Sequence, residues 1–342
     1  MDRISGLSDE LLLKILLLVP TKVAVSTSIL SKRWRYLWMW LPRLEFRYKR
    51  LLDPECESMW VSIALSHCLR ELEIARGSDS AKPVILPSDL FTCKSLVVLK
   101  LVGVILLDVP RILVSLPSLK TLKLQSLKYF NEETLQRLLS NCPILEDLVV
   151  DLRDGDTTGK LTVVVPSLLS FSLYIPYYHH IDGYVIETPS LKYFKLRDHH
   201  RNDDHYCLIE NMPHLVEAYL DVNLTDIKSL IGSITSVKHL EICSLTMLDE
   251  GFVFNQLEHL DLCLCPKHSS NNQLVRLLKS SPNLQGLHLF FVKYGHCFEF
   301  MGEWNQPTTV PECISSSLQK SEMLKELELS PRASAACRLM FE

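Results

Sequence analysis

Apolar residues recur along the chain in a fixed seven-residue pattern. The pattern is x-L-x-x-L-x-L, where other apolar residues can replace leucine, and it is clear in "SLKTLKL" and "SLKYFKL". It begins at eleven positions: Cys68, Ser95, Ser118, Ile144, Ser167, Ser190, His214, Ser236, Gln256, Asn283 and Met323. The first ten starts are 20–27 residues apart, and the last step is 40 residues. Such regular spacing indicates an internal structural repeat.

The pattern predicts one strand and one return segment for each repeat. Its last two apolar positions are two residues apart, so they share one face of a strand. In "LQRLLSNCPILEDLVV" from Leu135, leucines at i, i+3 and i+4 mark a short helix, and Pro143 ends it before the next strand. One repeat cannot bury its own apolar face, so stacked neighbours must form the core. We therefore expect an α/β leucine-rich-repeat solenoid with a parallel sheet on its concave side.

The residues that flank the penultimate apolar position should point away from this core. The candidates for contact with a target protein are Lys100, Lys123, Tyr193, Lys195, Tyr219, His239, Glu241, His259, Asp261 and His288. Neighbouring strands lie about 4.8 Å apart, so His239 and His259 should be adjacent, with the two acidic residues beside them. One hypothesis is a patch whose charge responds to pH. The alternative is an ordinary polar sheet surface.

The first forty residues are unusually apolar. Ser8, Asp9 and Glu10 suit the first turn of a helix, and Glu10 and Lys14 form a favourable i, i+4 pair. The other positions of this helix, from Leu7 to Leu18, are almost all leucine or isoleucine. A second helix is predicted from Ala24 to Trp38. Forty residues cannot cover so much apolar surface internally, so the solenoid or a partner must cover it.

The same apolar run is a poor signal peptide or membrane anchor. Acidic residues precede it, Lys14 interrupts it and Pro20 ends it, well short of the roughly 18–20 apolar residues that span a bilayer. The eleven cysteines are scattered without any C-x-x-C pair, so we expect neither a disulfide framework nor a zinc site. Reduced thiols fit the nucleus or the cytoplasm. No membrane association is expected.

Charge is distributed unevenly along the chain. The net charge is −4, but residues 1–50 contain ten Lys and Arg against four Asp and Glu. A basic N-terminal region could contact nucleic acid, yet no nucleic-acid-binding motif accompanies it, so a solvated face is favoured. We expect no nucleic-acid partner.

No catalytic or cofactor-binding motif stands out. Nucleophile-elbow, phosphate-loop, dinucleotide and H-E-x-x-H patterns are all missing from the sequence. The segments "YHHID" at 178–182 and "DHHRNDDH" at 198–205 could hold a metal, but their spacing favours two solvated loops between repeats. The chain is therefore expected to be a non-catalytic binding protein without a cofactor or metal.

The N-terminal segment carries a family resemblance. "DRISGLSDELLLKILLLVPTKVAVSTSILSKRWRYLW" resembles an F-box of the plant type that precedes leucine-rich repeats, although Ser8 stands where that motif usually has proline. The resemblance implies a three-helix domain that binds a Skp-type adaptor, and through it the cullin and RING subunits of a ubiquitin ligase. The residues that this resemblance assigns to adaptor binding are Leu7, Leu11, Leu12, Ile15, Leu16, Pro20, Trp34, Leu37 and Trp38.

The C-terminal segment carries a second resemblance. Trp304, Pro307, residues 310–313 and residues 323–325 are similar to the FBD region of many such plant proteins, but the stretch after Cys313 is shorter. The expected domains are thus an F-box at 1–45, repeats at 60–292, and a truncated FBD-like region with a final repeat strand at 293–342.

Together these features predict the substrate-recognition subunit of an SCF-type ubiquitin ligase in the nucleus or the cytoplasm. Such a subunit holds an unknown target protein near the catalytic subunits, so its contribution is proximity. The alternative is a stand-alone leucine-rich-repeat binder or inhibitor with a degenerate F-box that docks on its own repeats. Exposed apolar surface between residues 7 and 38 would argue against that alternative.

Overall fold

A computed structural model describes residues 4, 6–48, 54–67, 69–77, 83–111, 114–129, 133–200, 205–222, 228–244, 252–263, 277 and 280–290. It forms two compact units. The first unit ends at Leu168 and also contains His179–Ile181, and the second comprises Leu169–Tyr178 and the chain from Asp182 onward. The FBD-like tail and the repeat strand predicted near Met323 lie outside the described residues. None of the described helices is long and apolar enough to cross a bilayer.

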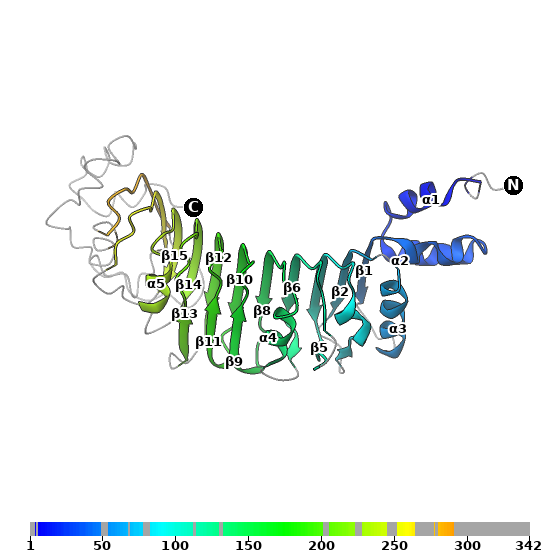
Figure 1. Ribbon diagram of the computed structural model, residues 1–342, viewed down its shortest axis with the longest axis horizontal. Coiled ribbons are helices and arrows are strands. Elements are labelled where there is room, and N and C mark those ends of the chain that lie inside the picture. Colours follow the sequence, from blue (N-terminus) through cyan, green and yellow to red (C-terminus); the bar gives the residue numbers. More distant parts are fainter. Residues whose placement is uncertain are drawn as a thin grey trace. The chain divides into compact units, whose positions relative to one another are not determined.

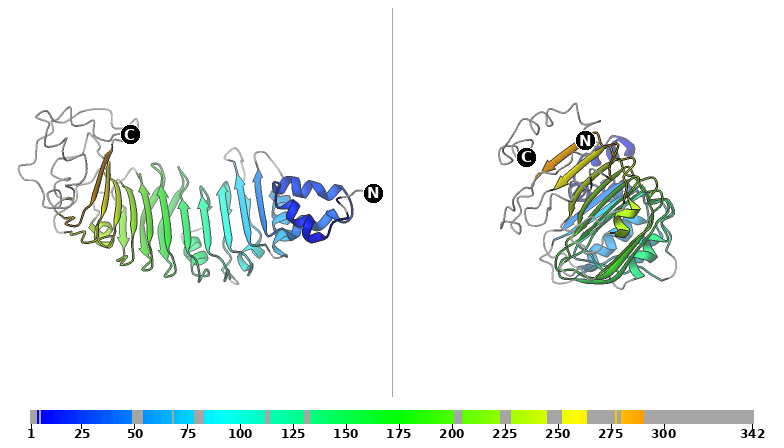
Figure 2. Two further views of the ribbon diagram at one scale, coloured as in Figure 1. Left: turned by 90° about the horizontal axis from the view of Figure 1, so that it is seen from above. Right: turned by 90° about the vertical axis from the view of Figure 1, so that its left-hand side faces the viewer.

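The N-terminal region forms α1 (Asp9–Leu16), α2 (Thr21–Ser26) and the 3₁₀ segments η1 (Thr27–Ile29) and η2 (Trp34–Trp40). Figure 2 shows these helices in blue beside the first strands of the first unit. The helix predicted over α1 is confirmed.

The single helix predicted from Ala24 to Trp38 is wrong, because the chain leaves helical geometry between η1 and η2. The hydroxyls of Ser26, Thr27 and Ser28 each donate a hydrogen bond to the backbone carbonyl three residues earlier. Such local bonds compete with the regular α-helical ladder and favour short 3₁₀ turns.

The first unit contains a parallel sheet of five strands (Figure 1). They are β1 (Arg43–Tyr48), β2 (Glu71–Arg76), β4 (Val98–Gly103), β6 (Thr121–Gln125) and β8 (Asp147–Asp151). The return segments contain α3 (Pro54–Leu65), β3 (Val84–Ile85), η3 (Ser88–Thr92), β5 (Ile105–Leu107), β7 (Lys128–Tyr129), α4 (Glu133–Leu139) and β9 (Thr157–Val164). The helix predicted from Leu135 is therefore present as α4.

The described residues of the second unit contain a parallel sheet of six strands. They are β10 (Ser170–Ile175), β12 (Tyr193–Asp198), β14 (Glu217–Val222), β15 (His239–Ser244), β16 (His259–Cys263) and β17 (Gly286–Phe290). Its return segments contain β13 (Tyr206–Ile209), which pairs in parallel with β11 (His180–Glu187), and α5 (Lys228–Ser233).

The apolar positions of the repeat pattern align in columns across the strands. The first column of the first unit consists of Leu72, Leu99, Leu122 and Leu148, which are paired in register and at most 1% exposed. In the second unit the corresponding column begins with Phe171 and Phe194, whose rings stack with centroids 5.9 Å apart. The parallel leucine-rich-repeat fold predicted from the periodicity is confirmed, and stacking supplies the core that one repeat lacks.

A recurrent turn precedes most strands and explains the prolines of the pattern. Leu119 N donates to Leu116 O, and the equivalent bond closes the turns that begin at Cys142, Val165, Thr188, Met212 and Ser281. The second residue of each of these turns is proline. Proline suits this position because its fixed φ matches the turn and its missing N–H is not needed.

Candidate functional site

The F-box region exposes an apolar surface. On α1 the side chains of Leu11 and Ile15 are 46% and 40% exposed. The next helices contribute Ile29, at 88%, and Leu30, at 64%, while Leu18 is 85% exposed in the loop after α1. So many exposed large apolar side chains within twenty residues are typical of a surface that binds another protein.

The nine predicted adaptor-binding residues divide into two groups in the structure. Five are buried within the chain: Leu12, Leu16, Trp34, Leu37 and Trp38, each no more than 6% exposed. Leu11, Ile15 and Pro20 are exposed, and Leu7 is half-buried. The buried group forms the core of the small helical domain and holds the exposed group in place. Their assignment to adaptor binding stays a prediction.

Ion pairs tie the F-box helices together. Arg33 Nε and Nη2 donate to Asp9 Oδ1 at 2.9 and 2.6 Å, so the start of α1 is connected to the start of η2. The predicted pair on α1 is present, because Lys14 Nζ lies 3.0 Å from Glu10 Oε1. Ser8 occupies the N-cap position, but its hydroxyl makes no capping hydrogen bond.

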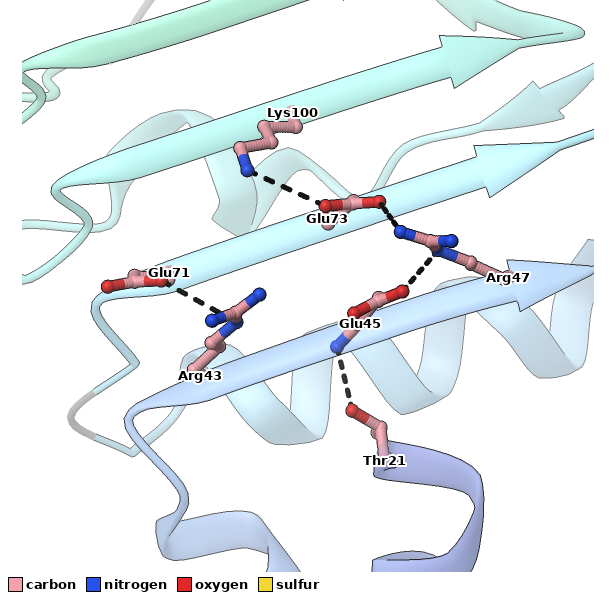
Figure 3. Close-up of polar contacts among 7 residues, drawn as sticks. All are labelled: Thr21, Arg43, Glu45, Arg47, Glu71, Glu73 and Lys100. Carbon is pink, nitrogen blue, oxygen red and sulfur yellow. Dashed lines mark hydrogen bonds and ion pairs between the residues drawn. The ribbon is translucent and has the colours of Figure 1, made fainter. Parts of the chain in front are cut away.

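A polar network joins the F-box to the first repeats within the same unit (Figure 3). The backbone N–H of Glu45 donates to Thr21 Oγ1 at 2.8 Å, which connects β1 to α2. Arg47 pairs with Glu45 on its own strand and with Glu73 on β2, where Nη2 and Oε1 are 3.0 Å apart. Lys100 Nζ on β4 lies 3.7 Å from the other oxygen of Glu73. The network fixes the entry of the chain into the sheet.

The open face of the first unit is defined by the outward positions of β1, β2, β4, β6 and β8. Its charged and polar groups pair across neighbouring strands. Gln125 Nε2 donates to Asp151 Oδ2 at 2.6 Å, and Thr121 Oγ1 lies 3.4 Å from Asp147 Oδ2. Lys100 and Lys123 occupy this face as predicted, in register with each other. Because Gln125 and Thr121 are neutral, their contacts orient the two carboxylates without neutralising their charge.

The open face of the second unit is defined by the outward positions of β10, β12, β14, β15, β16 and β17. Aromatic rings and cations pair on it. The Arg197 guanidinium lies 4.5 Å from the ring centroid of Tyr174, and Lys195 Nζ lies 4.3 Å from that of Tyr219. Aromatic residues and arginine are enriched among the residues that dominate binding energy at protein interfaces.

Three groups on or beside this face have displaced pKa values. Burial, followed by the charge of Asp221, raises the pKa of Tyr219 to about 12. The hydrogen bond that His199 Nε2 donates to Asp221 Oδ2, 2.8 Å away, raises the pKa of His199. Burial raises the pKa of Glu241, and the nearby Asp261 adds to this shift. Clustered pKa shifts mark candidate functional surfaces, although structural ion pairs produce them too.

The predicted histidine pair is present on this face. His239 and His259 are in register on β15 and β16, with ring centroids 4.7 Å apart and planes at 73°. Glu241 and Asp261 are in register two residues further along the same strands. His288 Nδ1 lies 3.6 Å from Asp261 Oδ1. Tyr193 lies exposed on β12, also as predicted.

Sequence reasoning missed a further column of this face. It contains Tyr174, Arg197 and Asp221, each one residue after the last apolar position of its seven-residue pattern. The missed signal is simple: the strand continues past the pattern, so the next residue also points outward.

The two histidine-rich segments were predicted to be solvated loops, and this is wrong for their buried polar residues, which are His179, Asp198, His200 and His205. His205 and Asp198 are buried, and His205 Nε2 lies 2.7 Å from Asp198 Oδ2. The same carboxylate oxygen accepts a hydrogen bond at 3.1 Å from the hydroxyl of Tyr184, whose pKa burial raises well above its usual value. Buried polar groups need partners, and the return segments supply them here. Asp203 and Asp204 lie outside the described residues.

In the first segment, His179 is also buried. Its Nδ1 lies 2.7 Å from Arg153 O and its Nε2 lies 3.0 Å from Thr158 Oγ1. His180, by contrast, is exposed at the start of β11. His179 thus connects the return segment after β10 to the return segment after β8.

Known proteins match the chain over most of its length. The F-box domain family matches residues 4–46, and the family described as "FBD-associated F-box protein At5g56370, LRR repeats" matches residues 58–217. The FBD-associated F-box protein At4g10400 of Arabidopsis thaliana is 53% identical over 96% of this chain and 87% of its own length.

Two further Arabidopsis thaliana proteins show similar agreement. The FBD-associated F-box protein At5g38590 is 48% identical over 93% of this chain and 86% of its own length. F-box protein At4g09920 is 50% identical over 79% of this chain and 96% of its own length. The apolar helical domain, the stacked repeats and these matches agree, and the chain therefore belongs to the plant family of FBD-associated F-box proteins with leucine-rich repeats.

Proposed function

We propose that the chain is the substrate-recognition subunit of an SCF-type cullin–RING ubiquitin ligase, acting in the nucleus or the cytoplasm. F-box proteins are generally non-catalytic substrate receptors, and the matched F-box at residues 4–46 supports this role for the chain. In this proposal the F-box binds a Skp-type adaptor, the adaptor connects to cullin and RING subunits, and the repeats hold a target protein. Catalysis by this chain would consist of proximity alone.

The exposed apolar surface of the F-box carries the adaptor proposal. Leu11, Ile15, Leu18, Ile29 and Leu30 are exposed around a core that the buried leucines and tryptophans already fill. An F-box that docked on its own repeats would have buried these five side chains. The surface therefore favours an external partner over the alternative of a degenerate F-box.

The open face of the second unit is the proposed target-binding surface. Its cation–π pairs, its half-buried Tyr219 and the displaced pKa of Glu241 are concentrated on neighbouring strands. Charged and aromatic groups that are partly desolvated gain more from a matching partner than fully solvated ones. On the first unit's face, Lys100 and Lys123 would contribute charge that steers the target.

The first test is adaptor binding by the purified full chain. The double variant Leu11→Asp and Ile15→Asp should weaken binding of a plant Skp-type adaptor about 100-fold or more, because two carboxylates would be buried in an apolar interface. Ile85→Asp is the matched control, since Ile85 is 60% exposed on β3, outside the F-box residues 4–46. Circular dichroism would establish that each variant is folded.

The outcomes separate the two readings. Tight binding by the wild type and by Ile85→Asp, lost in the double variant, would support the ligase role. A folded wild-type chain that does not bind the adaptor would overturn it and favour a stand-alone leucine-rich-repeat binder.

A further inference from the structure

A cluster of potential metal ligands lies at the start of two neighbouring strands in the second unit. His239 begins β15, His259 begins β16, and Glu258 immediately precedes His259. One ligand atom from each of the three residues lies within 4.8 Å of the other two. Two imidazoles and one carboxylate are thus brought together from two repeats.

The backbone around this cluster is held on both sides. The N–H groups of Glu258 and His259 both donate to Lys238 O, at 2.8 and 3.0 Å. On the other side the N–H groups of Gln285 and Gly286 donate to Glu258 O, at 2.8 and 2.9 Å. The positions of the three Cα atoms therefore depend on the sheet, and only side-chain torsions remain to be adjusted.

Gly286 makes room for one of the imidazoles. It lies opposite His259 on β17, and a Cβ atom added there would come within 2.5 Å of His259 Nδ1. Any other residue would push the ring away, because Cβ atoms essentially never approach other heavy atoms so closely. The glycine leaves space for the His259 ring on the side of β16 that faces β17, opposite to the side of His239.

The ligand types suit one kind of ion. Imidazole nitrogen and carboxylate oxygen are common ligands of Zn²⁺, and sites with three protein ligands keep a fourth position open. Ligand atoms around tetrahedral zinc lie about 3.3 Å apart when the bonds are about 2.0–2.1 Å long. Modest side-chain rotation can reach this spacing, because both histidines are exposed.

The charges around the cluster also favour a cation. Glu217 lies in register with His239. Glu241 and Asp261 lie two residues after His239 and His259 on β15 and β16. The opposing charge is Lys238, whose Nζ lies 3.0 Å from Glu258 Oε1. The Lys238 ammonium group forms an ion pair with this carboxylate oxygen, so it would compete with a metal ion for the same ligand atom.

We propose that His239, His259 and Glu258 form a binding site for one divalent zinc-class ion on the open face of the second unit. The site does not depend on adaptor binding by the F-box.

Zinc titration of the full chain, by calorimetry after chelator treatment and in reducing buffer, tests the site. The thiols of this chain will also bind Zn²⁺, so the decisive quantity is the difference between variants. His239→Ala and Glu258→Gln should each weaken one equivalent of zinc binding about 10-fold or more. His288→Ala removes a histidine from the same face and should leave the affinity for that zinc ion unchanged.

Two further results would separate this site from adventitious binding. Lys238→Gln should tighten zinc binding several-fold, because it removes the competing ammonium. Lowering the pH from 7.5 to 5.5 should weaken it at least 10-fold, because metal ligation requires neutral imidazoles. An excess of Mg²⁺ should not compete, since that ion prefers oxygen ligands.

The proposal would be overturned if His239→Ala and Glu258→Gln bound as many zinc ions as the wild type, with the same affinity. It would also be overturned if imidazole NMR signals of His239 and His259 did not move at one equivalent. Circular dichroism and the His288→Ala control exclude loss of folding as the cause of weaker binding.

Discussion

The two units build their cores from the same repeat but use its outward positions differently. In the first unit, charges on β1, β2 and β4 neutralise one another, as in the chain of contacts from Arg47 through Glu73 to Lys100. In the second unit, cations lie over aromatic rings and histidines lie beside carboxylates. Core columns constrain only the inward residues, so the open faces can diverge without loss of the fold.

Each unit also contains a close contact that its outward positions do not explain. Asp198 of the second unit is almost fully buried and accepts hydrogen bonds from Tyr184, from the backbone N–H of His200, and from His205. In the first unit, Gly103 allows a close backbone approach, with φ at +93°. The buried Asp198 cluster of the second unit and the close approach at Gly103 of the first unit can therefore be tested separately.

The largest expected effect comes from Asp198→Ala. It leaves Tyr184 and His205 buried without their acceptor, which should cost about 3–5 kcal/mol. Hydrogen exchange should accelerate in β11, β12 and β13 far more than in β4 and β6, because each repeat contacts only its neighbours. Asp182→Ala, at an exposed position, is the control and should change stability by less than about 0.5 kcal/mol. Equal effects of the two substitutions would contradict a structural role for the cluster.

Gly103→Ala is the matching test in the first unit. Its Cβ atom would come within 1.7 Å of the Arg76 carbonyl oxygen, so the backbone must shift, at a cost of about 3 kcal/mol or more. Gly155 also has positive φ, at +70°, but has no atom within 4 Å of the added Cβ. Gly155→Ala should therefore cost only about 1 kcal/mol. Chemical denaturation would measure both, and a reversed order would contradict the steric argument.

Asp221→Asn tests the electrostatics of the second unit's face. The hydrogen bond to Asp221 raises the pKa of His199, so its stabilisation is present at low pH and is lost as pH rises above about 6.5 through the folded pKa. The substitution should lower the pKa of His199 in an NMR titration and reduce the loss of stability over that range. The free-energy change should stay below about 1 kcal/mol, because both side chains are partly exposed. An unchanged pKa would show that Asp221 is not its cause.

Glu73→Gln in the first unit should have the smallest effect. It removes the partner of Arg47 and Lys100, but surface ion pairs contribute only about 0–1 kcal/mol. Thermal unfolding at low and high salt would measure the change, which salt should diminish. A loss above about 2 kcal/mol would mean that the network of Figure 3 fixes the F-box on the first repeats more strongly than its exposure indicates.

Local periodicity was sufficient for much of this protein. For every strand of the two open faces except β1, the seven-residue pattern predicted the strand and the residues that face the core, and it also placed His239 beside His259. It could do so because strand alternation and register follow from spacing alone. Helix α1 and its Glu10–Lys14 pair were predictable for the same reason, since i, i+4 neighbours share one helix face.

Only the tertiary structure decided the features that join distant segments. The burial of Asp198 and His205, the break between Ile29 and Trp34, and the approach of Glu258 and Lys238 to the histidine pair carry no periodic signal. The physical reason is that a polar residue is buried where its hydrogen bonds are satisfied, and those partners come from other parts of the chain. The sequence by itself determined the repeat and its two-residue alternation, whereas packing decided which polar groups are enclosed and which remain on the open faces.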